Sequence, residues 1–299
     1  VLDSTGDVDH RITFDPKRVI PMQEHAPLRR PQFLAVISSV ALAGSLAKKA
    51  TGHVDGFVVE NNTAGGHNAL PRGPMHLSDQ GEPIYGTKDE VNLRALAELG
   101  RPFWLAGAFA TPEKLRAAVA AGASGIQVGT MFAFAKESGV SASFKEVVRK
   151  MAVNNEKPVV FTDPLASPSG FPFKVVRLAD TMSEAEVYGA RPRRCDLGYL
   201  RMPYLRGDGK LDYRCASEPV DAYLKKGGTL QETEGRKCLC NGLLATVDLP
   251  QHRKEGYTEP ALITAGDDLA EINRWLGADG YSASDVIRYL RGSTEGKPS

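Results

Sequence analysis

The sequence contains no long apolar run and no excess of charge of either sign. No stretch approaches the roughly 18 consecutive apolar residues that a membrane-spanning helix needs. The first residues, VLDSTGDVDHR, lack the basic and apolar regions of a signal peptide. Lys and Arg total 37 against 36 Asp and Glu, so no global field attracts nucleic acid or an anionic membrane. These absences predict a cytoplasmic protein that binds neither nucleic acid nor a membrane.

Cysteine is scarce, with four residues in 299. A cytoplasmic location argues against disulfides. The close pair in KCLCN could supply two ligands of a four-thiolate zinc site. The candidate zinc ligands are Cys195, Cys215, Cys238 and Cys240. Zinc sites more often use CxxC knuckles and an iron–sulfur cluster has no recognisable spacing here, so reduced thiols without metal are the alternative.

Strand-like runs alternate with amphipathic helical segments from Gln32 to about Lys136. The predicted strands are 33–39, 56–61, 102–108 and 125–130, and the predicted helices are 41–52, 89–99, 111–122 and 131–138. Thr111 can cap the third helix, with Pro112 at its first position. Four strand and helix pairs in series predict an α/β fold with a parallel sheet covered by helices.

Two α/β architectures share this alternation. The chain lacks the GxGxxG fingerprint that a doubly wound sheet usually carries after its first strand. A (β/α)8 barrel of the TIM type binds phosphate after its seventh and eighth strands, which LAGAF (105–109) and QVGT (127–130) fit. We therefore predict strands five to eight of such a barrel, with strands one to four before Val1. Half a barrel leaves unpaired edges, so it should be incomplete or associate, for instance as a homo-oligomer.

The rest of the chain is less regular. A proline-rich stretch predicts a connector over residues 1–31. The half barrel then covers 32–140, and an appended, irregular α+β region with all four cysteines covers 141–265. Residues 266–299 predict one or two terminal helices, with Ser282 or Ser284 as a cap.

The most informative stretch is GFVVENNTAGGHN, residues 56–68, where a buried-strand pattern runs into two glycines and a histidine. Gly65 and Gly66 let the backbone approach a ligand closely, and His67 is presented beside them. Strand ends in LAGAF and QVGT follow downstream. Three such ends at one edge of a parallel sheet predict a single ligand site for a phosphate-bearing cofactor.

These motifs, TAGGHN followed by LAGAF and QVGT, resemble the nitronate monooxygenase family, formerly called 2-nitropropane dioxygenases. The resemblance covers Pro31 to about Ser138 well and Phe161 to Lys174 loosely. It implies a barrel that binds flavin mononucleotide (FMN) and oxidises an alkyl nitronate with O2, giving a carbonyl compound and nitrite. Flavin-dependent enoyl-ACP reductases of the same superfamily share a similar pattern.

By this resemblance, His67 corresponds to the active-site histidine beside the flavin ring. The same resemblance, together with the departure at Glu60, where relatives often have Gln, implies a set of residues around the cofactor. They are Glu60, Gly65, Gly66, Gly107, Ala108, Gln127, Val128, Gly129 and Thr130.

The chemistry of these residue types agrees with those roles. Backbone amides in glycine turns and at a helix amino terminus stabilise a phosphate dianion without basic side chains, and Thr130 adds a hydroxyl. The alternative is that Gly107 and Gly129 only make tight turns. His67 could donate a hydrogen bond to an anionic nitro group, since a nitronate needs little proton abstraction. Without a cofactor role, His67 would be a structural or exposed histidine.

The sequence therefore predicts an FMN-dependent oxidoreductase that resembles nitronate monooxygenases and acts on a small-molecule nitronate with O2. An enoyl thioester reductase, taking hydride from a nicotinamide through the flavin, is the enzymatic alternative. A non-catalytic barrel fragment or a metal-stabilised interaction module is the alternative from another class.

Overall fold

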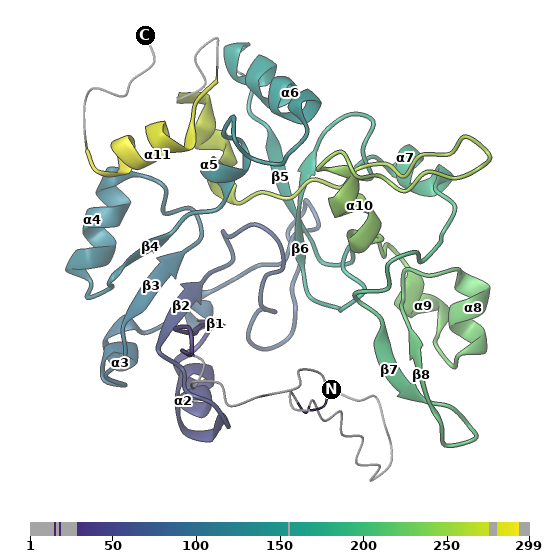
Figure 1. Ribbon diagram of the computed structural model, residues 1–299, viewed down its shortest axis with the longest axis horizontal. Helices are drawn as coiled ribbons and strands as arrows, with labels where there is room; N and C mark the ends of the chain where they lie inside the picture. Colours follow the sequence, from purple (N-terminus) through teal and green to yellow (C-terminus); the bar gives the residue numbers. More distant parts are fainter. Residues whose placement is uncertain (1–14, 16–17, 19–28, 155, 275–279, 293–299) are drawn as a thin grey trace.

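The computed structural model describes residues 15, 18, 29–154, 156–274 and 280–292. Its first part is a parallel sheet whose strands are hydrogen-bonded in sequence order. The strands are β1 (Leu34–Ile37), β2 (Gly56–Glu60), β3 (Phe103–Ala106) and β4 (Gly125–Gln127). Helices α2 (Val40–Lys49), α3 (Leu93–Ala97) and α4 (Pro112–Ala120) connect them (Figure 1). The predicted α/β fold and its four consecutive parallel strands are confirmed.

Helix starts follow the capping residues in the sequence. Thr111 accepts a hydrogen bond from Lys114 N at 3.2 Å, so α4 begins at Pro112 as predicted. Helix α3 is shorter than the predicted 89–99, because the side chain of Asn92 caps the N–H of Ala95 at 3.0 Å. A 3-10 turn, η1 (Thr87–Asp89), ends at the first residue of the predicted range.

The predicted helix over 131–138 is the clearest local error. Helix α5 (Thr130–Ala133) has only four residues. The chain leaves the helix at Phe134, and the hydroxyl of Ser138 turns back to donate to the carbonyl of Ala133 at 2.5 Å. A serine hydroxyl that satisfies a helix-end carbonyl competes with continuation of the helix.

The second half of the chain has antiparallel strand pairs in place of strand and helix units. Strand β5 (Val159–Asp163) pairs with β6 (Phe173–Arg177), and β7 (Met202–Leu205) pairs with β8 (Leu211–Arg214). Figure 1 shows β7 and β8 far from the parallel sheet, with β5 and β6 between them. The helices of this half are α6 (Ala142–Val153), α7 (Ala185–Ala190), α8 (Val220–Lys225), α9 (Leu230–Thr233) and α10 (Leu239–Ala245).

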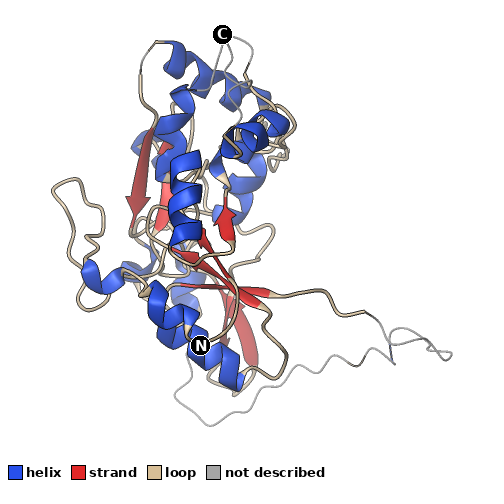
Figure 2. Cartoon of the chain, turned by 90° about the vertical axis from the view of Figure 1, so that its left-hand side faces the viewer, coloured by secondary structure: helices blue, strands red, loops and turns tan. Residues whose placement is uncertain are grey.

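The end of the chain returns to the parallel sheet. The 3-10 helix η2 (Asp267–Arg274) contacts α5, α6 and β5, and α11 (Ala283–Leu290) contacts α4 and α5. Figure 2 shows this side of the molecule, with helices lying over the strands. Ser282 caps α11, as one of the two predicted caps. The shared core of this region includes Met131, Phe134, Val148, Val176, Ile263, Leu269, Ile272, Tyr281 and Val286.

Parts of two predicted segments fall outside the described residues. They are 1–14, 16–17 and 19–28 of the predicted connector, and 275–279 and 293–299 of the terminal segment. The division of the chain at residues 31, 140 and 265 stays a prediction, as does the numbering of the strands as five to eight.

Candidate functional site

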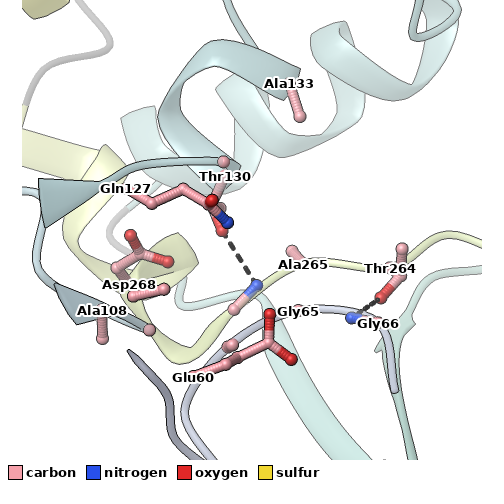
Figure 3. A pocket seen from close by; sticks show the side chains of 15 residues that line it. Glu60, Gly65, Gly66, Ala108, Gln127, Thr130, Ala133, Thr264, Ala265 and Asp268 are labelled. Carbon is pink, nitrogen blue, oxygen red and sulfur yellow. Dashed lines mark hydrogen bonds between the residues drawn. The ribbon is translucent and has the colours of Figure 1, made fainter. Parts of the chain in front are cut away.

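A cavity of about 310 Å³ lies at the carboxyl ends of β2, β3 and β4. Its walls are mostly backbone and small side chains, and it gathers the strand ends that the sequence singled out (Figure 3). The lining residues are Glu60, Ala64, Gly65, Gly66, Ala106, Gly107, Ala108, Gln127, Gly129, Thr130, Ala133, Thr264, Ala265, Gly266 and Asp268. Eight of the nine predicted cofactor residues therefore line one space. The exception is Val128, whose side chain packs against the apolar core.

The turn after β3 favours glycine at position 107. Gly107 has a φ of +96°, and a Cβ there would lie 2.1 Å from Oδ1 of Asn61 and 2.8 Å from Oγ1 of Thr63. Asn61 is fixed in turn, because it accepts hydrogen bonds from the N–H and the hydroxyl of Thr63. The next residue, Ala108, also has a positive φ, +52°. This turn brings Ala108 to the cavity, and the N–H of Ala108 is not bonded to another described residue.

The turn after β4 brings Gly129 and Thr130 to the same cavity. The N–H of Gly129 is not bonded to another described residue. Thr130 is buried, and its hydroxyl accepts from the N–H of Gly266 at 2.9 Å (Figure 3). Because α5 is a single turn, its dipole adds little to anion binding. The stabilisation of a phosphate by a helix amino terminus, which the sequence predicts here, is therefore small. The individual N–H groups remain as donors.

The glycine loop after β2 packs against a segment from the far end of the chain. A Cβ on Gly65 would lie 2.8 Å from the carbonyl carbon of Ala265. The N–H of Gly66 donates to Oγ1 of Thr264 at 2.8 Å. We call Thr264 to Asp268 the 264–268 segment. Sequence reasoning missed it, although its Ala-Gly pair after the buried Leu262 and Ile263 repeats the strand-end pattern.

Two carboxyl groups line the cavity. Burial raises the pKa of Glu60, at the end of β2. Burial also raises the pKa of Asp268, while the hydroxyl of Thr130 and the positive charge of Lys114 act against this rise. Figure 3 shows both carboxyl groups among the side chains that surround this space. An anion bound here therefore meets backbone donors and two acidic side chains.

His67 follows the glycine loop but does not line the cavity. Its Nε2 is hydrogen-bonded to Oγ of Ser167 at 2.7 Å, and its ring packs edge-on against Phe173, with 4.9 Å between centroids. Ser167 is fully buried and also hydrogen-bonds to Ser169. Partial burial lowers the pKa of His67, so the imidazole is neutral near pH 7. The loop between β5 and β6 thus holds this histidine.

The structure does not support the predicted zinc site. Among the described residues, which include all four cysteines, no group of three or more His, Cys, Asp or Glu could hold a metal ion. Cys215 and Cys238 are buried, and Cys195 is exposed. Burial raises the pKa of the Cys238 thiol to about 11, which disfavours the thiolate that zinc requires. Reduced thiols without metal, the alternative drawn from the sequence, stay a prediction.

The fold and the cavity define an α/β protein with a cavity at the carboxyl edge of a parallel sheet, where ligands of such folds bind. The sequence pattern of the nitronate monooxygenase family matches residues 12–175, more than half of the chain. The chain belongs to the nitronate monooxygenase family. That family is named for an oxidoreductase, and the match covers every predicted cofactor residue and His67.

Two solved structures show weaker similarity to the chain. A FabK mutant from Thermotoga maritima shares 17% identity at a TM-score of 0.44, over 88% of this chain and 58% of that one. Nitroalkane oxidase from Streptomyces ansochromogenes shares 21% identity at a TM-score of 0.36, over 49% and 38%. The chain thus spans little more than half the length of the first of these structures and less of the second. A search of curated proteins finds no match. Within the described residues, no helix is long and apolar enough to span a bilayer.

Proposed function

We propose that the chain forms the phosphate-binding part of an FMN-dependent oxidoreductase that oxidises alkyl nitronates with O2 to a carbonyl compound and nitrite. The observation that carries the proposal is the convergence of three glycine turns on one cavity, at positions inside the family match. The flavin, when bound, supplies the electron-accepting chemistry.

The donor set of the cavity fits a phosphate monoester. Ala108 and Gly129 line the cavity, and their N–H groups have no partner among the described residues. Gly107 lets the β3 turn pass close to Asn61, where a side chain would collide. Amides fixed in such turns bind a phosphate without a basic side chain. Ala108 and Gly129 would therefore hold the phosphate, and Gln127 lines the same cavity.

His67 would act on the substrate and not on the phosphate. Its neutral imidazole has one N–H, and the hydrogen bond to Ser167 fixes the ring. With Nε2 engaged by Ser167, Nδ1 is the ring atom left to meet the substrate. We propose that His67 hydrogen-bonds the nitro group of a nitronate, orienting it and stabilising its negative charge.

The absorption spectrum of the purified protein tests this function. The chain should be expressed alone and with any natural sequence that precedes Val1. We expect flavin bands in the longer form, together with nitronate-dependent O2 uptake and release of nitrite. Bleaching of the flavin by NADH without O2, with no nitronate turnover, would identify an enoyl thioester reductase. Absence of flavin from both forms would leave the glycine turns structural and favour an interaction module.

A further inference from the structure

Asp268 is the most unusual polar group in the cavity. It is 7% exposed, it lines the cavity, and its Oδ1 has no hydrogen-bond partner among the described residues. An unpartnered buried carboxylate oxygen is costly, and native structures rarely keep one without a role. The natural complement of this oxygen is a proton or a ligand that carries a donor.

The 264–268 segment holds Asp268 in place. Gly266 donates to Thr130, Gly66 donates to Thr264, and the N–H of Asp267 donates to the carbonyl of Thr63 at 3.0 Å. The loop after β2 and the turn after β4 are therefore both bonded to this segment. These bonds hold the backbone of Asp268 at the cavity, so an anion that binds there shares the space with its carboxyl group.

The charges around Asp268 do not neutralise it. The nearest ammonium group of α4, on Lys114, donates to the carbonyl of Ala108. Lys174, on β6, is buried and pairs with Asp267 at 2.6 Å. The titratable and charged groups around Asp268 are Glu60 of β2, which lines the same cavity, Lys114 of α4, Asp267 of η2 and Tyr281 before α11. Lys174 of β6 joins this group through its ion pair with Asp267.

We propose that binding of a phosphate monoester in this cavity is coupled to uptake of one proton by Asp268. The inference rests on the proposed function, because it takes the FMN phosphate as the ligand. An ionised carboxylate beside a phosphate dianion in a partly closed cavity is repelled. A protonated carboxyl group instead donates its O–H to a phosphate oxygen. The proton comes from solvent and returns there when the ligand leaves.

The test compares FMN binding by the wild-type protein and by Asp268→Asn, in the longest form that binds flavin. Quenching of flavin fluorescence gives Kd across the range from about pH 6 to about pH 8. The asparagine is neutral, has the same shape and keeps a donor. We expect it to bind FMN about tenfold more tightly than wild type at the alkaline end, where one linked proton changes affinity by about tenfold per pH unit. The two affinities should converge at the acid end.

Controls separate this effect from others. Riboflavin lacks the phosphate, so Asp268→Asn should leave its affinity unchanged. Asp180→Asn removes an exposed carboxylate outside the cavity, at a φ of +60° that asparagine tolerates, and should keep the wild-type pH profile. Any pH dependence left in Asp268→Asn belongs to Glu60 and to the phosphate itself.

A second measurement needs no variant. Calorimetric titration of wild-type protein with FMN, in buffers of different ionisation enthalpy, should show net proton uptake at the alkaline end of the range. Equal pH profiles for wild type and Asp268→Asn, or no proton uptake, would overturn the inference and leave the proposed function standing. Failure of every form to bind FMN would overturn both.

Discussion

The side chain of His67 lies outside the cavity, although its neighbours in the sequence, Gly65 and Gly66, line it. It follows the two glycines that line the cavity, yet its ring turns to Ser167 and Phe173 in the second half of the chain. Ser167 is buried, so it can fix the orientation of the imidazole better than an exposed group could. The histidine therefore lies apart from the glycine turns that line the cavity.

Removing His67 should separate cofactor binding from turnover. We expect His67→Ala to retain flavin but to lose most nitronate turnover, by about a hundredfold or more, because a fixed hydrogen-bond donor to the substrate anion is lost. Burial lowers the pKa of His67 below the ordinary histidine value of about 6.5. Wild-type turnover should therefore not depend on pH above about 6.5 and should change only as the pH falls below that value. Unchanged turnover in His67→Ala would remove this residue from the mechanism.

Ser167 can be tested as a positioning residue. Ser167→Ala should lower kcat with little change in KM or flavin content, because the ring of His67 loses its anchor while the cavity is untouched. Ser167→Thr keeps the hydroxyl and should restore part of kcat. Ser169→Ala keeps the bond between Ser167 and His67 and serves as the control. A rise in KM without a fall in kcat, or no rescue by threonine, would contradict this role.

Most residues of the cavity could be predicted from the sequence, because glycines at strand ends mark them. Glycines that need a positive φ or close backbone approach can be read from the chain, as Gly107 illustrates. Asp268 could not be found this way. Its position in the cavity depends on bonds between Gly66 and Thr264 and between Thr130 and Gly266, which join residues more than a hundred positions apart.

At the scale of elements, capping residues predicted where helices start, but helix lengths were harder to predict from the sequence. Thr111 and Ser282 begin α4 and α11 as their sequences indicate. Asn92 and Ser138 shorten neighbouring helices through side-chain hydrogen bonds that compete with the helix ladder. The strand ends were predictable because each combines a buried apolar run with a glycine. The short β4 (Gly125–Gln127) still delivers Gln127 to the cavity.

The turn after β3 offers a direct test of the link between backbone geometry and cofactor binding. Gly107→Ala should reduce the free energy of unfolding by about 1–3 kcal/mol and cause loss of flavin, because its φ is left-handed and its Cβ would meet Asn61. Urea denaturation and the absorbance of bound flavin measure the two effects.

Gly129→Ala is the matched control for this turn. Gly129 also lines the cavity, but its φ is −113° and a Cβ there would meet nothing within 4 Å. We expect its stability to stay close to wild type. Equal destabilisation by the two substitutions would mean that glycine at position 107 serves chain flexibility and not this close approach.

For the whole molecule, the main surprise is that the end of the chain completes the site. The 264–268 segment forms one wall of the cavity, and η2 and α11 pack on the parallel part of the fold. The sequence indicated helices near the end but not where they pack, because periodicity records which face is apolar and not which partner covers it. The appended region is therefore part of the candidate site.

The outer strand of the sheet exposes apolar side chains. Within the described residues β1 pairs only with β2. Phe33 and Val36 are each 54% exposed and Leu34 is 37% exposed. An edge strand with free backbone groups and apolar side chains pairs readily with another strand. We therefore expect this 299-residue chain, expressed alone, to self-associate through β1.

Val36→Lys should weaken that association by about tenfold or more, because a lysine on an edge strand disfavours pairing with a second strand. Sedimentation velocity over a range of concentrations measures it. Val153→Lys, at an equally exposed valine at the end of α6, is the control and should associate like wild type. If both variants associate equally, the contact lies elsewhere. If the wild-type chain stays monomeric at every concentration, the β1 edge is stable in solvent, and the argument that a half barrel must associate fails with it.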